Sequence, residues 1–326
     1  MIKLRRSLLA LAMATTGLMT IAALPATAYA AAPQVKKSAP GYYRVMLGDF
    51  EITALSDGAF MPPVNKLLQG ISPKAIDKAL SADFQNPMAM SINAFLINTG
   101  SKLILVDTGL GGFEEGFGPG LNHVIENLKA AGYTPEQVDE VYITHMHPDH
   151  IGGLFKDGQR AFPNAIVRAD QHETDQWLSQ ANMDKAPDGW KFAFREALQT
   201  FKPYVDAGQF KPFSGTQVLS PGITAVAEAG HTHGHTIYKV ESKGQTLILW
   251  GDLMHVASVQ FANPGVTIAF DTDNKRAAAA RKRVYAEAAA KGYLIGAAHI
   301  SFPGLGHMRA KGKGYEWVPV NYVPLY

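Results

Sequence analysis

Residues 145 to 150 hold three histidines and one aspartate in the pattern His-x-His-x-Asp-His. Neutral imidazole and ionised carboxylate are common protein ligands of zinc and similar divalent ions. In an extended segment alternate residues share a face, so His145 and His147 can point at one ion. Pro148 breaks the strand, and Asp149 and His150 can then turn toward a second ion about 3.5–4 Å from the first, as in two-metal hydrolases. The pattern predicts a dinuclear metal centre.

Three further candidate ligands each follow an apolar, strand-like segment. His231 comes shortly after residues 223–227, Asp252 follows residues 246–250, and His299 follows residues 293–298. In layered α/β folds the carboxyl ends of strands meet at one rim, which is where ligands bind. We therefore expect these side chains to gather with the histidines of residues 145–150.

Together these motifs resemble the metallo-β-lactamase superfamily. The blocks are His-x-His-x-Asp-His, Gly-His-Thr-x-Gly-His at 230–235, Gly-Asp at 251–252, the late His299, and the early strand with its Asp-Thr-Gly turn at 103–109. The resemblance runs from about residue 50 to residue 305. It implies an α/β fold, a single-domain four-layer αββα sandwich with the metals at the edge between two sheets.

The resemblance also implies a role for each ligand. One ion would be held by His145, His147 and His231, and the other by Asp149, His150 and His299. Asp252 would bridge the two ions together with a hydroxide. Asp107 and His235 would lie behind the ligands and orient them. The cofactors would be two divalent ions, zinc first, although manganese, iron and cobalt suit the same ligands.

Four segments narrow the resemblance to methyl parathion hydrolase and its lactonase-like relatives: residues 38–44, 47–52 (expected as a strand), 177–180 and 301–322. This subgroup implies a small-molecule ester, lactone or phosphotriester substrate and suggests a homodimer. Positions that match its hydrophobic pocket would be Phe117, Trp177, Phe192, Phe194, Ile268 and Phe270.

His255 stands three residues after Asp252, where specialised methyl parathion hydrolases carry an apolar residue. A histidine there could donate a proton to a lactone or ester leaving oxygen, and would narrow a phosphotriester pocket. The alternative is a buried histidine bonded to a neighbouring carbonyl group. With bulky Ile268 and Phe270, His255 favours a lactone or aryl-ester hydrolase whose side activity is on organophosphate triesters, with Asp252 and His255 as the catalytic residues.

Other functions compete with this interpretation. The first is a dedicated organophosphate triester hydrolase, and a lesser one is a non-catalytic periplasmic metal-binding protein. A mononuclear thiol or sulfur dioxygenase would use fewer ligands, and a β-lactamase fits Asp149, Asp252 and His299 less well.

Residues 1–30 have a basic start, an apolar stretch and a small-residue end at Ala28-Tyr29-Ala30, which predicts a signal peptide cleaved near Ala30. The mature chain would be secreted or periplasmic, with an arm at 31–45, a hydrolase domain at 46–326 and no membrane anchor.

Without Lys3, Arg5 and Arg6, the 30 basic residues become 27 against 28 acidic ones, a net charge of −1. This balance indicates no nucleic-acid partner. Zero cysteines exclude disulfides and a cysteine ligand.

The remaining sequence predicts ordinary structural elements. Helices are expected at 73–81, 121–131 and 274–291, the last with Asp273 or Asn274 as N-cap and Gly292 as stop. Lys243-Gly244 predicts a hairpin turn.

Overall fold

The computed structural model describes residues 32–36, 38–113 and 117–325. The chain divides into two units, Met1–Ser38 and Ala39–Tyr326. In the first unit the described residues, 32–36 and 38, are exposed and lie outside helices and strands. The predicted signal peptide and its cleavage site near Ala30 lie outside the described residues.

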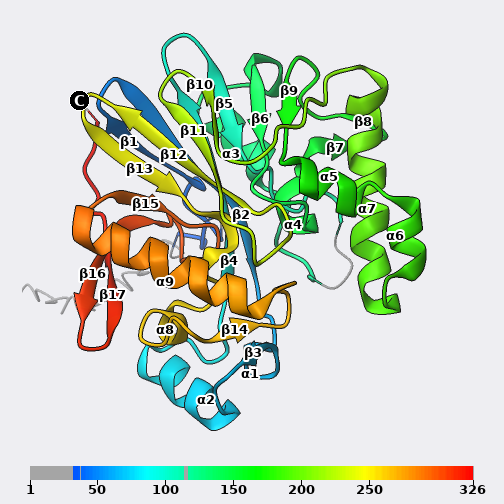
Figure 1. The fold of residues 1–326 in the computed structure, drawn as a ribbon. Helices are drawn as coiled ribbons and strands as arrows, with labels where there is room; N and C mark the ends of the chain where they lie inside the picture. Colours follow the sequence, from blue (N-terminus) through cyan, green and yellow to red (C-terminus); the bar gives the residue numbers. More distant parts are fainter. Residues whose placement is uncertain (1–31, 37, 114–116, 326) are drawn as a thin grey trace, which may run out of the picture. The chain divides into compact units, whose positions relative to one another are not determined.

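Two β-sheets form the centre of the second unit (Figure 1). The first sheet has six strands in the order β1 (Tyr42–Leu47), β2 (Phe50–Phe60), β4 (Met90–Asn98), β5 (Leu103–Val106), β6 (Glu140–Tyr142), β9 (Ile166–Arg168). The second has seven in the order β10 (Gln217–Ser220), β11 (Ile223–Ala227), β12 (Thr236–Ser242), β13 (Gln245–Leu249), β15 (Leu294–Gly296), β16 (Leu305–Lys311), β17 (Gly314–Pro319). Two short pairs are β3 (Leu68–Gln69) with β14 (Thr267–Ile268), and β7 (Phe155–Lys156) with β8 (Gln159–Arg160).

Helices follow and cover these strands. The α-helices are α1 (Val64–Leu67), α2 (Pro73–Ala82), α3 (Val124–Ala130), α4 (Pro148–Ile151), α5 (Gln171–Trp177), α6 (Gln180–Lys185), α7 (Asp188–Asp206), α8 (Ala257–Gln260) and α9 (Asn274–Lys291). Short 3₁₀ turns are η1 (Pro135–Gln137), η2 (Gly152–Leu154) and η3 (Gly251–Leu253).

Successive side chains along a strand point to opposite faces of its sheet, and so belong to different layers of the core. On β5, Ile104 and Val106 pack between the two sheets, against residues such as Leu247 of β13. Leu103 and Leu105 point to the other face, into the cluster that contains α3 and α7 side chains. A third cluster packs α9 onto the outer face of the second sheet. The layers are therefore helix, sheet, sheet, helix, and the expected αββα sandwich is confirmed.

The predicted helices occur, with shifted ends. Helix α9 has the expected bounds, with Asp273 as N-cap and Gly292 in the left-handed conformation after its last turn. Helix α2 extends to Ala82. Helix α3 begins only at Val124, because the amides of His123 and Val124 are bound instead by the carboxylate of Asp57.

Three local predictions, a turn, a strand and the end of the N-terminal arm, have different outcomes. The Lys243-Gly244 turn joins β12 to β13 with both residues at positive φ, as expected for a hairpin. Residues 47–52 are not one strand, because Gly48 (φ +57°) and Asp49 make the turn between β1 and β2. Residues 42–45 pair in β1, so the predicted arm at 31–45 reaches too far into the sheet.

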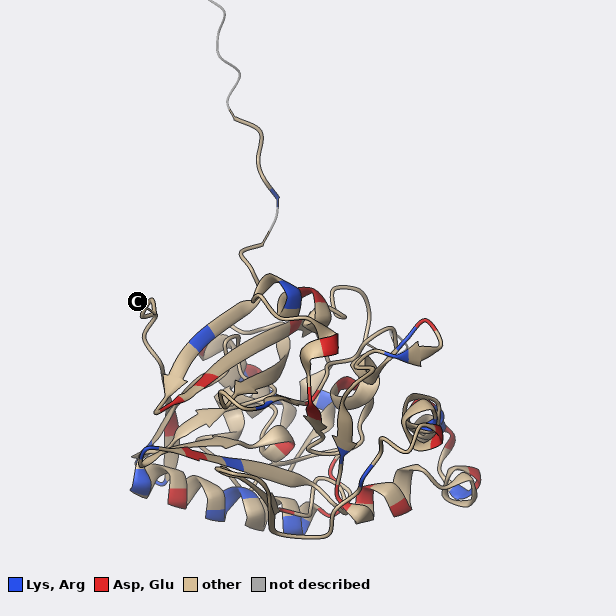
Figure 2. Cartoon of the chain, turned by 90° about the horizontal axis from the view of Figure 1, so that it is seen from above, with Lys and Arg blue, Asp and Glu red and all other residues tan. Residues whose placement is uncertain are grey.

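Basic and acidic side chains are interspersed over the described elements, α9 included (Figure 2). Among the described residues, none of the helices is both long and apolar enough to span a bilayer.

Candidate metal centre

Five chain segments bring the candidate ligands together at one edge of the two sheets. His145 and His147 follow β6, and Asp149 and His150 lie in the single turn of α4. The three remaining candidates come from the loop after β11, from η3 after β13, and from the loop after β15: His231, Asp252 and His299. All seven side chains are buried.

One group of ligand atoms consists of three imidazoles and one carboxylate oxygen. His147 Nδ1 lies 3.0 Å from His145 Nε2 and 3.0 Å from His231 Nε2. Asp252 Oδ2 lies 3.5 Å from His145 Nε2 and 3.2 Å from His231 Nε2. These four residues can surround one ion.

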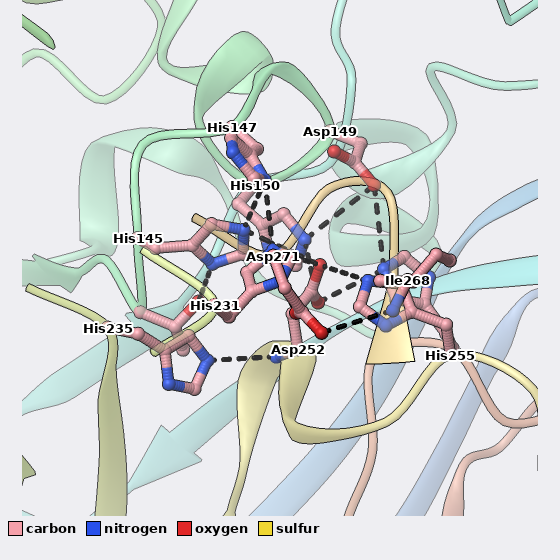
Figure 3. Close-up of polar contacts among 12 residues, drawn as sticks. His145, His147, Asp149, His150, His231, His235, Asp252, His255, Ile268 and Asp271 are labelled. Carbon is pink, nitrogen blue, oxygen red and sulfur yellow. Dashed lines mark hydrogen bonds and ion pairs between the residues drawn. The ribbon is translucent and has the colours of Figure 1, made fainter. Parts of the chain in front are cut away.

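A second group gathers around the other oxygen of Asp252. Asp252 Oδ1 lies 3.1 Å from His150 Nε2 and 3.0 Å from His299 Nε2. Asp149 Oδ2 is 3.6 Å from each of these two nitrogens. Asp149, His150 and His299 can hold another ion. Asp252 thus faces both groups, one oxygen toward each (Figure 3).

In three of the ligand histidines, the hydrogen bonds of Nδ1, the ring nitrogen that points away from the ligand groups, show that the site fits cations. His150 Nδ1 donates to Asp107, His231 Nδ1 to Asp271, and His299 Nδ1 to the carbonyl oxygen of Ser91. Because carboxylate and carbonyl oxygens only accept, the protons lie on Nδ1 and a neutral ring turns a lone pair inward at Nε2. His150 Nε2 and Asp252 Oδ1 are buried without a hydrogen-bond partner among the described residues.

Electrostatics support the same arrangement. Burial by itself would raise the pKa of Asp252, but the facing histidines, His150 first, hold it well below its ordinary value. Burial lowers the pKa of His145 and of His147 well below the ordinary value. The carboxylate is therefore ionised and His145 and His147 are neutral, which are the protonation states that bind divalent ions. Against the effect of burial, the facing carboxylate of Asp252 raises the pKa of His150, of His231 (to about 9) and of His299, so metal binding at these three rings would release protons.

Two predicted residues lie behind the ligands. The carboxylate of Asp107 accepts from His150 Nδ1 at 2.8 Å and from the backbone amide and hydroxyl of Thr144, each at 2.9 Å. His235 Nε2 accepts from the backbone amide of Asp252 at 3.0 Å. Burial, then repulsion by His231, lowers the pKa of His235 to about 3, so its ring is a neutral acceptor.

Sequence reasoning missed two carboxylates that hold the ligand loops. Asp271 accepts from His231 Nδ1 at 2.9 Å. Glu173 accepts from the backbone amides of Met146 at 2.8 Å and of Gly234 at 2.7 Å, and so joins two ligand loops. Glu173 lies 27 positions after Met146 and 61 positions before Gly234, and Asp271 lies 40 positions after His231. Neither residue belongs to a motif, so the sequence pattern gave no signal for them.

A cavity of about 410 Å³ opens onto the ligands. His147, Asp149, Asp252, His255 and His299 contribute to its floor. Its apolar walls come from the end of β2 and the turn into α1, the start of β4, the loop between β5 and α3, α7 and the segment after β14: Phe60, Met61, Pro62, Pro63, Leu67, Met90, Phe117, Trp190, Phe192, Ala269 and Phe270. Such a cavity suits a small molecule with an apolar body and one reactive polar group.

The structure corrects the predicted pocket list in part. Phe117, Phe192 and Phe270 line the cavity. Ile268 lies in the core with α2 and α8, fully buried. Trp177 packs edge-on against His147, with centroids 5.3 Å apart, and Phe194 packs behind Trp177, so both belong to the core.

Trp190 takes the wall position that was expected of Trp177. It lies four residues before the core residue Phe194 on α7, so helical spacing alone would have placed it on the buried face and gave no signal for the cavity.

His255 reaches both the ligands and the cavity. Its Nε2 lies 3.0 Å from Asp252 Oδ2, and its backbone amide donates to Gln260. Burial lowers the pKa of His255 to about 4, so its ring is neutral. The carboxylate can only accept, which places the proton on Nε2. His255 is thus hydrogen-bonded to the carboxylate of Asp252, and not to a carbonyl group as in the alternative drawn from the sequence.

The family model of the metallo-beta-lactamase superfamily matches residues 88–294, and the chain belongs to this superfamily. The fold agrees with this membership, and the two ligand groups could each hold a metal ion.

Curated relatives align with part of the chain. A ribonuclease of Thermus thermophilus is 29% identical over 167 residues, which cover 49% of this chain and 35% of the relative. An acyl-coenzyme A thioesterase of Bos taurus is 24% identical over 184 residues, covering 51% of this chain and 60% of the relative. The chain thus spans only about a third to three fifths of these relatives' own length.

Solved structures match over most of the chain. The hydrolase AbOPH of the beta lactamase superfamily has a TM-score of 0.82 and 38% identity, covering 88% of this chain and 100% of that chain. AidC, a dizinc quorum-quenching lactonase in complex with a product, has a TM-score of 0.80 and 26% identity, covering 87% of this chain and 99% of that chain.

Proposed function

We propose that the chain is a dinuclear metal-dependent hydrolase of lactones or aryl esters, with side activity on organophosphate triesters. The observation that carries the proposal is Asp252, whose two oxygens face separate ligand groups at the floor of an apolar cavity. The similarity to a dizinc lactonase over 87% of the chain supports a lactone substrate. The two metals are expected to be zinc.

Bound divalent cations would supply Lewis acidity and a water of lowered pKa at neutral pH. The protein residues would then handle the substrate and the proton. Attack by water on the carbonyl carbon forms one C–O bond, and breaking the bond to the leaving oxygen completes hydrolysis. Asp252 lies where it can accept the water's proton and pass the same proton to the leaving oxygen, which balances the step. The Nε2–H of His255, in contact with Asp252 Oδ2, can hydrogen-bond to that oxygen as it leaves.

The need for that donor separates the substrate classes. An alkoxide released from a lactone is a poor leaving group and gains from protonation, whereas a nitrophenolate leaves without help. His255 occupies floor area between Asp252 and Phe270, with its ring centroid 6.2 Å from that of Phe270. A neutral histidine at this point supports lactone or ester hydrolysis over triester hydrolysis.

The second candidate is a dedicated organophosphate triester hydrolase of the methyl parathion type. The aromatic walls at Phe117, Trp190 and Phe192 favour it, because they can stack on an aryl leaving group. They serve an aryl ester equally well, so only rates distinguish the two.

The test is kcat/KM of the metal-loaded protein on dihydrocoumarin, an aryl acetate and methyl parathion under one set of conditions. Lactone or ester values well above the triester value are expected. A triester value above both would replace the proposal by the second candidate. No turnover of any of them by protein that holds two ions would favour a metal-binding protein.

We also propose that the chain is exported and cleaved near Ala30. Mass spectrometry of the mature N-terminus tests this, and a retained leader would contradict it. The homodimer stays a prediction, and light scattering of the purified protein would test it.

A further inference from the structure

One segment of the cavity wall is hydrogen-bonded directly to the loop that carries the candidate metal ligand His231. Residues 264–273 run through β14 into α9, and Ala269 and Phe270 line the cavity. The next residue, Asp271, turns its side chain away from solvent, with 0% of it exposed. The wall and the ligand loop therefore meet at consecutive residues.

Four hydrogen bonds join this segment to the loop that carries His231, one of them from the hydroxyl of Thr272 to the carbonyl of Gly230 at 3.2 Å. Asp271 Oδ1 accepts from His231 Nδ1 at 2.9 Å (Figure 3). The backbone amide of Thr272 donates to the carbonyl of His231 at 2.9 Å, and that of Asp273 donates to the carbonyl of Gly230 at 2.9 Å. The other oxygen of Asp271 accepts from the amide of Ile268 at 3.1 Å, which closes the turn under Phe270.

A buried arginine stabilises the junction from α9. The side chain of Arg281 is 1% exposed, and its Nη2 lies 3.8 Å from Asp271 Oδ2. Its Nε donates to the carbonyl of Leu253, the residue after Asp252, at 2.6 Å. Its Nη1 donates to the carbonyl of Val266 at 2.5 Å. A buried cation is stable only with such partners, so Arg281 fixes the turns of both Asp252 and the wall segment.

We propose that Asp271 is a positioning residue that couples the cavity wall at Phe270 to the metal ligand His231, with Arg281 as its buried counter-charge. By accepting from Nδ1, Asp271 selects the ring tautomer whose Nε2 lone pair faces the ligand group. By accepting from Ile268, it sets the turn that presents Phe270 to the substrate. One side chain therefore controls both metal affinity and the shape of the wall.

The experiment compares Asp271→Asn with wild type. Asparagine keeps the size and one acceptor, but it loses the charge and would set an amide N–H₂ against one of the two donors. The metal arm uses zinc competition against a chelator and the visible spectrum of the cobalt-substituted protein. We expect about 10- to 100-fold weaker affinity for one ion, the range seen when the outer partner of a ligand is lost, and a changed cobalt spectrum.

The kinetic arm rests on the proposed function. At saturating zinc, KM for an aryl ester should rise several-fold in Asp271→Asn because Phe270 is no longer held. If wild type hydrolyses no ester or lactone, the proposed function fails. The aryl compound's binding constant, measured by fluorescence quenching, then replaces KM, and the metal arm is unaffected.

Glu140→Gln is the matched control. Glu140 is a buried, ion-paired carboxylate at the start of β6, where it binds Lys102 and Arg168. Its loss should lower stability without changing metal affinity, the cobalt spectrum or KM. Wild-type metal affinity in Asp271→Asn, or an unchanged KM beside a weakened site, would overturn the coupling.

If Asp271→Asn does not fold, a second variant, Asp271→Glu, tests the same proposal. Asp271→Glu keeps the anion but moves it by one methylene, so it should fold and still alter the cobalt spectrum. A cobalt spectrum identical to wild type in Asp271→Glu would overturn the proposal.

Discussion

The imidazole of His255 stacks on that of His299, with ring centroids 5.1 Å apart and an interplanar angle of 18°. His299 belongs to the ligand group of Asp149 and His150, while His255 Nε2 contacts Asp252 Oδ2, the oxygen that faces the other group. His255 thus lies against both groups and also lines the cavity.

Replacing His255 by leucine should shift specificity. His255→Leu removes the donor for a poor leaving group and adds apolar surface to the floor, so methyl parathion turnover should rise relative to dihydrocoumarin turnover. The expected change in the ratio of kcat/KM values is about tenfold, or about 1.4 kcal/mol. Side-by-side kinetics at equal metal content measure it. A parallel fall in both rates would assign His255 a purely structural role.

Replacing Asp252 by alanine should remove the link between the ligand groups. Asp252→Ala is expected to lose about one equivalent of metal and to lower kcat by on the order of a thousandfold or more, because the water and its proton lose their partner. Elemental analysis and steady-state kinetics provide the measurement. A fully metallated variant with near-wild-type rates would contradict the bridging position.

The clustering of the candidate ligands could be predicted from the sequence because each of them follows an apolar strand within a few residues, and strand ends meet at one rim. It was less informative about the cavity. Trp177 and Phe194 stand in the right part of the chain, but their helices turn them into the core, while Trp190 reaches the cavity. Asp271 meets His231 across 40 positions of sequence, a contact that no local pattern encodes.

The loop of His231 is tightly packed at Gly230. This residue has φ +155°, and a Cβ there would lie 2.4 Å from the backbone nitrogen of Ala277 on α9. Gly230→Ala should therefore lower the free energy of unfolding by about 1–3 kcal/mol through overpacking, and should weaken metal binding by displacing His231. Thermal unfolding and chelator competition test both effects.

The control is Gly244→Ala, which also sits at positive φ (+76°) but has no atom within 4 Å of the added Cβ. Gly244→Ala should lower the free energy of unfolding through backbone strain at positive φ, without changing metal affinity. Equal metal affinities in the two variants would mean that packing at Gly230 does not position His231.

Glu140 gives a pH-dependent contribution to stability. Burial would raise the pKa of Glu140, but hydrogen bonds from Lys102 and Arg168 bring it below its ordinary value of 4.5. Because the folded pKa is the lower one, the contribution is present above pH 4.5 and is lost as the pH falls through the folded value. In metal-free protein at pH 7, Glu140→Gln should lower the free energy of unfolding by about 1–2 kcal/mol.

Urea unfolding at several pH values should show the difference between wild type and Glu140→Gln shrinking below pH 4.5. A difference that stays constant down to pH 3 would mean that the ion pairs of Glu140 do not contribute through its charge.

Trp190 should set the preference for aryl substrates. It lines the cavity, its ring centroid is 5.5 Å from that of His147, and it meets Phe270 edge-on at 6.5 Å. Trp190→Ala removes the aromatic surface against which an aryl group can stack, so KM for an aryl acetate should rise about tenfold. KM for a small aliphatic lactone should change little, because that substrate occupies only the floor. Since Trp190 is not a ligand, zinc content should stay at the wild-type value. If KM rises equally for both substrates, Trp190 supports the ligand His147 rather than the aryl group.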